Sequence, residues 1–251
     1  MSGLTAGPGR SRSSQAAAGA GCTSVEAPSS PLTGSSLLPT VSSVCQENRR
    51  VARRNVQTSH DRNRYRVELG KHSLKASEEG AIAVGTAKII THEDYNIMLS
   101  RNDIALIKLS SPVTLSDTVM PACLPDRDSV LPHGSPCYVT GWGRLSTSGP
   151  LADILQQALL PVVGHNICKQ PDWWSVLATD KMVCAGGDGI TAGCNGDSGG
   201  PLNCQNPDGS WDVHGVVSFG SGQGCNVFQK PTVFTQVSSY ISWINTIMTK
   251  Y

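Results

Sequence analysis

Short apolar stretches recur along the chain from Tyr65 onward, and residues typical of turns separate them. Gly, Pro, Asp and Asn interrupt these stretches at short intervals. Regular short strands bounded by turn signals predict an all-β sandwich or barrel. The predicted strands are Tyr65–Leu69, Ile82–Ile90, Asp103–Leu109, Cys137–Trp142, Leu155–Val163, Met182–Cys184, Pro201–Cys204, Trp211–Phe219 and Thr232–Val237.

The last segment of the chain has a different period. Val237, Tyr240, Ile241, Ile244 and Ile247 follow one another at helical spacing. Apolar residues at this spacing lie on one face of a helix. The pattern therefore predicts one amphipathic helix over Val237–Met248, after the last strand.

The first quarter of the chain lacks this pattern of apolar stretches separated by turn residues. All 13 aromatic residues lie at or after Tyr65, and residues 1–44 are rich in Ser, Ala, Gly and Pro. Such a composition buries too little apolar surface to offset the entropy of ordering, so we expect residues 1–62 to be low-complexity and mostly disordered, or a replaced segment. No apolar signal-peptide core is visible there. We interpret the basic run at residues 49–54 as a solvated tail rather than a nucleic-acid patch.

Composition narrows the class of protein further. A chain of 251 residues accommodates one large all-β domain or two small ones. Its net charge of +1 argues against nucleic acid or an anionic membrane as a main partner, and it has no run of 18 apolar residues. The nine cysteines form no C-x-x-C pairs, so we expect disulfides and an oxidising compartment rather than zinc, with at least one thiol left over.

The sequence Gly-Asp-Ser-Gly-Gly, at residues 196–200, carries the most specific chemistry in the chain. Gly196 and Gly199 permit backbone angles that a Cβ would forbid. Successive N–H groups then point at one spot, so Gly196 and Ser198 are the expected oxyanion-hole donors and Ser198 the candidate nucleophile. Asp103, at the start of an apolar strand, would reach the interior and could accept the N–H of an imidazole base.

These residues resemble the chymotrypsin-like serine proteases of the trypsin family, and within it the pancreatic elastases of the elastase-2 type. The resemblance extends from Tyr65 to Tyr251 and includes the phrases at residues 138–143, 182–187, 213–220 and 230–235. It implies a serine endopeptidase in residues 63–251, built as two six-stranded antiparallel barrels followed by a helix. Residues 63–125 would be the remnant of an incomplete first barrel, and residues 126–251 the second barrel with the helix.

The family pattern also implies roles for particular residues. Ala192 would form the floor of the substrate pocket and Thr232 its wall, while Gly220 would leave the entrance open. Ser218, Phe219 and Gly220 would pair with the substrate backbone. An uncharged pocket favours medium to large apolar side chains before the scissile bond. The implied disulfides are Cys137–Cys204, Cys168–Cys184 and Cys194–Cys225, and Cys45 or Cys22 could bond Cys123.

The resemblance further implies an extracellular, monomeric enzyme that acts on polypeptides and is bound by protein protease inhibitors. We expect no cofactor. Glu78 and Glu79 lie where relatives have a calcium loop, but two adjacent glutamates are more typical of solvated surface, so we expect no metal either.

Two parts of the family pattern are missing from the sequence. The phrase Thr-Ala-Ala-His-Cys, which carries the catalytic base, does not occur; His60 is the remaining candidate, and an exposed loop histidine is the simpler interpretation. No Ile/Val-Val-Gly-Gly activation site follows a basic residue, so Asp197 would lack the ammonium group that normally pairs with it.

Three hypotheses follow from these absences. The chain is an elastase-like endopeptidase whose activity is impaired; or it is a non-catalytic protease homologue or binding module that uses the retained pocket; or residues 1–62 come from altered splicing or an imperfect gene model. The third hypothesis explains all the missing features together.

Overall fold

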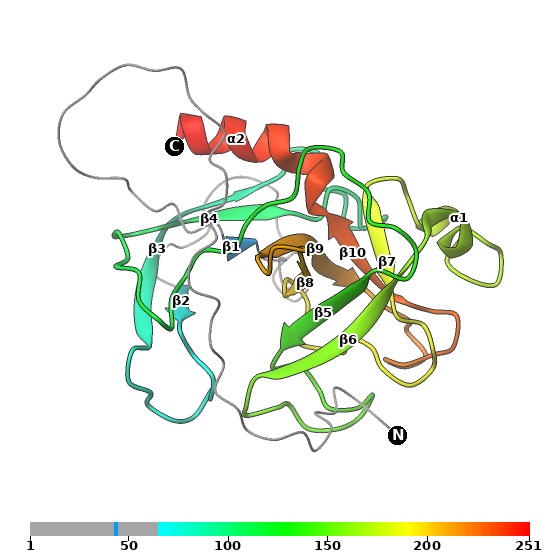
Figure 1. Cartoon of the computed structure of the whole chain (residues 1–251), viewed down its shortest axis with the longest axis horizontal. Coiled ribbons are helices and arrows are strands. Elements are labelled where there is room, and N and C mark those ends of the chain that lie inside the picture. Colours follow the sequence, from blue (N-terminus) through cyan, green and yellow to red (C-terminus); the bar gives the residue numbers. More distant parts are fainter. Residues whose placement is uncertain (1–42, 45–64) are drawn as a thin grey trace.

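The computed structural model describes residues 65–251 and the two-residue strand β1 (Ser43–Val44) (Figure 1). The remaining residues of the N-terminal quarter, including His60 and the basic run, lie outside the described residues. The strand β1 was not expected from the sequence.

The C-terminal half forms a closed six-stranded barrel with the strand order β10-β7-β6-β5-β8-β9. Every neighbouring pair is antiparallel. Closure leaves no strand edge exposed, which protects the barrel from edge-to-edge pairing. The strands are β5 (Pro136–Gly141), β6 (Gln156–Val163), β7 (Met182–Ala185), β8 (Pro201–Gln205), β9 (Trp211–Phe219) and β10 (Thr232–Gln236).

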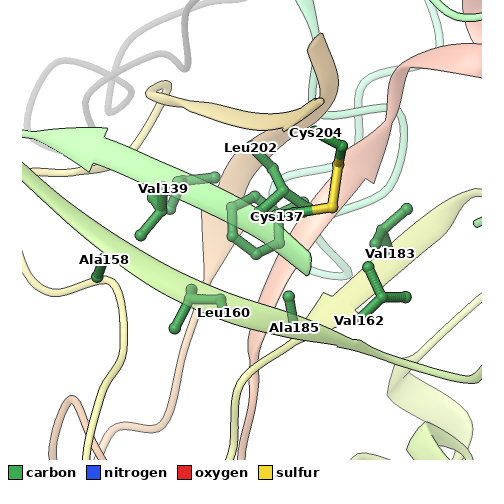
Figure 2. Close-up of a cluster of buried hydrophobic side chains, with 11 residues drawn as sticks. Cys137, Val139, Ala158, Leu160, Val162, Val183, Ala185, Leu202 and Cys204 are labelled. Carbon is green, nitrogen blue, oxygen red and sulfur yellow. A yellow bond between two sulfur atoms is a disulfide. The ribbon is translucent and has the colours of Figure 1, made fainter. Parts of the chain in front are cut away.

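Alternating inward residues of these strands fill the barrel (Figure 2). Leu160, Leu202 and Phe234 are among its fully buried side chains. Cys137 and Cys204 face each other across β5 and β8 and are joined by a disulfide. The core therefore forms inside the barrel because apolar side chains at every second position of each strand point inward.

The N-terminal half is a four-stranded antiparallel sheet in the order β1-β4-β3-β2. Its other strands are β2 (Arg66–Leu69), β3 (Ile82–Thr91) and β4 (Ala105–Leu109). Val84, Val113 and Val119 form a small core against it. Within the described residues this sheet does not close into a barrel, whereas a complete first barrel of the family would have six strands.

The chain ends in a 3₁₀ turn, η3 (Val237–Tyr240), and the helix α2 (Ile241–Lys250). The apolar positions at helical spacing were predicted correctly, but the first turn is 3₁₀ rather than α. Ile244 of α2 packs in one buried cluster with Ile104 and Leu106 of the N-terminal half and Val216 of the barrel. Two short helical segments, α1 (His165–Cys168) and η2 (Ser175–Leu177), were not predicted.

All three disulfides implied by the family resemblance are present. Cys123 is also disulfide-bonded, and its partner lies outside the described residues. Among the helices of the described region, none has the length and apolar character needed to cross a membrane. The same region contains no cluster of three or more His, Cys, Asp or Glu residues that could hold a metal ion.

Candidate active site

The Ser198 loop connects β7 to β8 and is held in place on both sides of the serine. Cys194 is disulfide-bonded to Cys225 before it. After it, the N–H of Gly199 donates to the carbonyl of Val217 at 2.9 Å, and the N–H of Val217 donates to the carbonyl of Gly200 at 2.9 Å. The loop is thus attached to β9, while Ser198 itself remains exposed to solvent.

Two backbone N–H groups at this loop have no acceptor among the described residues, those of Gly196 and Ser198. Gly196 has φ +103°, a conformation that other residues rarely adopt. A Cβ at this position would also lie 3.2 Å from the Cα of Gly143. The glycine therefore leaves space and two free donors next to the serine hydroxyl, which suits a developing oxyanion.

Asp197 precedes the serine and is almost completely buried, with 2% of its surface exposed. Its Oδ1 accepts the N–H of Gly143 and its Oδ2 accepts the N–H of Cys194, both at 2.8 Å. Burial raises the pKa of Asp197, and these two hydrogen bonds act in the opposite direction. No cationic side chain of residues 65–251 pairs with it, so backbone dipoles alone compensate the carboxylate within that range.

Asp103 lies two residues before the start of β4 and is buried, with 3% exposure. Ser218 Oγ donates to its Oδ2 at 2.6 Å, and Thr235 Oγ1 donates to its carbonyl oxygen at 2.8 Å. Asp103 has a further interaction besides these. Burial, together with the negative charge of Asp103, raises the pKa of Tyr240 to about 12.

The strand β9 brings the two halves of the site together. Its Val217 exchanges backbone hydrogen bonds with Gly199 and Gly200, directly after Ser198, and the next residue, Ser218, donates a hydrogen bond to Asp103. From sequence, Ser218 was expected only at the edge that pairs with substrate. Sequence reasoning missed its hydrogen bond to a residue 115 positions away, and the matched phrase at residues 213–220 was the only signal near it.

Four of the five histidine rings of residues 65–251 contact groups other than the serine. In this range no hydrogen bond joins a histidine to Ser198 or Asp103. Their contacts are Tyr240 and Trp243 for His92, the Val162 carbonyl for His133, Asp180 for His165, Asp212 for His214, and a backbone N–H to Glu78 for His72. The sequence candidate His60 lies outside the described residues.

The predicted pocket residues carry no charged side chain. Ala192 and Thr232 are buried, at 2% and 3% exposure, and Thr232 Oγ1 accepts the N–H of Gly193 at 3.0 Å. Phe219 packs edge-on against Trp174 with ring centroids 5.2 Å apart. Gly220 is exposed, and a Cβ there would contact nothing within 4 Å.

Comparisons with known proteins agree with these features. The family model described as Trypsin matches residues 17–244. Bovine (Bos taurus) chymotrypsin-C is 60% identical over 182 residues, which cover 72% of this chain and 68% of the relative. Bovine proproteinase E is 52% identical over 185 residues, covering 72% of this chain and 73% of the relative. Macaca mulatta chymotrypsin-like elastase family member 3B is 52% identical over 184 residues, covering 72% and 71%.

Proposed function

Because the chain belongs to the trypsin family and is by family a serine endopeptidase, we propose that Ser198 is the nucleophile that attacks the carbonyl carbon of a peptide bond. The hydroxyl loses its proton to a base as the C–O bond forms, and the carbonyl oxygen becomes an oxyanion. The free N–H groups of Gly196 and Ser198 stabilise this charge. The proton then passes to the leaving amine, the C–N bond breaks, and water hydrolyses the acyl-enzyme.

Asp103 has the properties of the residue that orients the base. Its carboxylate is buried, and the hydroxyl of Ser218 fixes one of its oxygens at 2.6 Å. A carboxylate held in this way can accept an imidazole N–H, set the tautomer of the ring and stabilise the imidazolium that forms. Asp103 is therefore a positioning residue, and its role depends on a histidine.

The substrate preference follows from the uncharged pocket. Ala192 at its floor offers no carboxylate to a basic side chain, and the hydroxyl of Thr232 is already occupied by a backbone N–H. Gly220 leaves the entrance open. We propose cleavage after medium to large apolar residues, the elastase-like preference. The substrates are polypeptides, and the enzyme acts as a monomer whose active site protein inhibitors can bind. Its disulfides suit an extracellular location.

We propose further that hydrolysis by this chain is impaired. No histidine between residues 65 and 251 is hydrogen-bonded to Ser198, four of the five rings contact other groups, and the sequence lacks the family phrase that supplies the base. The oxyanion hole and bound substrate alone still give roughly 10³–10⁴-fold acceleration over water when a triad member is missing. The chain would therefore react slowly at Ser198 rather than not at all.

A fluorophosphonate probe tests both parts of the proposal. After trypsin treatment of the full chain, we expect slow addition of probe mass at Ser198 and none in the Ser198→Ala variant. If the base is missing, His60→Ala leaves the labelling rate unchanged within about twofold, whereas loss of a working base lowers it by orders of magnitude.

The outcomes separate the hypotheses. Rapid labelling that is lost in His60→Ala contradicts the impairment and assigns His60 as the base. No labelling at all contradicts the nucleophile assignment and leaves the non-catalytic homologue or binding module. Transcript sequencing over residues 1–64 tests whether altered splicing or a faulty gene model produced that segment.

A further inference from the structure

A cavity of about 450 Å³ is lined by Arg101, Lys181 and Tyr240, among other residues, and by none of the predicted substrate-pocket residues. Its walls come from the segment before β4, the segment before β7, and β10 with the turn that follows it. The volume falls in the range of small-molecule sites, roughly 300–1,000 Å³. The proposed hydrolysis does not use this cavity.

Two cations lie on the wall of the cavity, Arg101 and Lys181. Both side chains belong to exposed residues, and neither has a carboxylate at ion-pair distance within the described part of the chain. Lys181 Nζ lies 5.3 Å from the ring centroid of Tyr240, which holds the ammonium group at the cavity. The cavity therefore presents two positive charges that the described residues leave uncompensated.

The acidic residue on the same wall, Asp180, does not cancel these charges. Its Oδ1 accepts a hydrogen bond from Lys169 Nζ at 2.9 Å and lies 2.6 Å from His165 Nε2. These neighbours lower the pKa of Asp180, so it is ionised but already paired. A ligand entering the cavity meets Arg101 and Lys181 as the unpaired groups.

The rest of the lining contains both apolar surface and polar groups. Met182 is buried, with 6% exposure, and the ring of Tyr240 forms an apolar wall. The Tyr240 hydroxyl donates to Asn102 Oδ1 at 2.9 Å, and the Thr235 hydroxyl donates to the Asp103 carbonyl at 2.8 Å. Since these two hydroxyls are occupied, the polar groups left to recognise a ligand are the two cations and the hydroxyls of Ser100 and Thr179, beside the apolar surface.

We propose that this cavity binds a small organic carboxylate with an apolar body. The carboxylate pairs with Arg101 and Lys181, because a guanidinium and an ammonium are the preferred partners of a carboxylate. The apolar body lies against Met182 and Tyr240. This site is independent of the proposed hydrolysis, because neither cation contacts Ser198 or Asp103.

Isothermal titration of the full chain with 3-phenylpropionate tests the proposal, with the uncharged 3-phenylpropionamide as the ligand control. We expect saturable binding of the carboxylate with a Kd on the order of 1 mM or tighter, and much weaker binding of the amide. Arg101→Glu and Lys181→Glu should each weaken binding about tenfold, because each removes an attraction and adds a repulsion. Arg101→Gln and Lys181→Gln should give smaller losses in the same direction.

Arg127→Glu is the matched control, since Arg127 is exposed, carries the same charge and donates to Ser242 outside the cavity. It should leave the Kd unchanged within about twofold, which excludes an effect of net charge alone. Binding that is insensitive to changes at both Arg101 and Lys181 overturns the proposed location. Absence of saturable binding up to about 10 mM overturns the site itself. Because no readout depends on Ser198, failure here is distinct from failure of the proposed function.

Discussion

Replacing Gly143 with alanine would test whether the carboxylate of Asp197 organises the serine loop. The N–H of Gly143 donates to Asp197 Oδ1 at 2.8 Å. A Cβ at residue 143 would lie 2.5 Å from both carboxylate oxygens of Asp197. Real Cβ atoms do not approach oxygen so closely, so the carboxylate must move away from its two N–H donors.

The size of the effect can be worked out from these contacts. Forcing extra volume into a packed site costs roughly 1–3 kcal/mol. Loss of a hydrogen bond to a charged buried group costs roughly 1.5–3 kcal/mol more. We therefore expect Gly143→Ala to lower the free energy of unfolding by about 2.5–6 kcal/mol, which is a large part of the roughly 5–15 kcal/mol of a typical domain.

Urea denaturation followed by tryptophan fluorescence measures this loss, and fluorophosphonate labelling reports on Ser198. Both should fall together, because Asp197 is adjacent to Ser198 in the loop. Gly222→Ala is the matched control, since a Cβ there contacts nothing within 4 Å. If Gly143→Ala loses less than about 1 kcal/mol, near the scatter of surface substitutions, the reasoning about the buried carboxylate is refuted.

Three further predictions concern the core, the titration of the site and the pocket. Phe234→Ala should lower the free energy of unfolding by about 3–5 kcal/mol in urea denaturation, because Phe234 is fully buried in the barrel. The control Phe228→Ala should cost little, because Phe228 is 66% exposed. Equal losses of stability in the two variants would contradict the assigned core. Carboxyl ¹³C NMR should find Asp197 titrating above its usual 3.8, since burial raises its pKa. Between pH 3.8 and the raised pKa of Asp197, the folded protein keeps a proton that the unfolded chain releases. The contribution of this group to stability therefore falls as the pH rises through this range. A measured pKa at or below 3.8 would disprove the prediction. Ala192→Asp places a carboxylate at the proposed pocket floor, so benzamidine should raise the Tm of the variant and not that of the unmodified chain; equal shifts would count against the pocket.

The strands could be predicted from the sequence because their apolar residues alternate between turn signals. Trp211–Phe219 has the predicted bounds, and the other predicted strands that the structure contains differ at their ends by only one or two residues. The segments α1 and η2 are too short for a helical period to emerge from the pattern. The strand β1 has only two residues, and its pairing with β4 depends on residues more than 60 positions away, which no local pattern can reveal.

The serine loop was predictable for a different reason, since glycine positions reflect local backbone requirements. Contacts between distant segments were not predictable. The hydrogen bond from Ser218 to Asp103 and the one from Gly143 to Asp197 depend on how loops meet after folding. A side-chain hydroxyl or a backbone N–H carries no signal of its partner until the tertiary structure brings the two together.

The position of α2 has a consequence for variants of this chain. Ile244 joins Ile104 and Leu106 of the sheet to Val216 of the barrel in one apolar cluster. The helix thus packs against both the N-terminal sheet and the barrel and fixes their separation. A premature stop codon before Ile241 would remove this connection, and under the proposed function the two halves could then no longer hold Asp103 and Ser198 at a fixed separation.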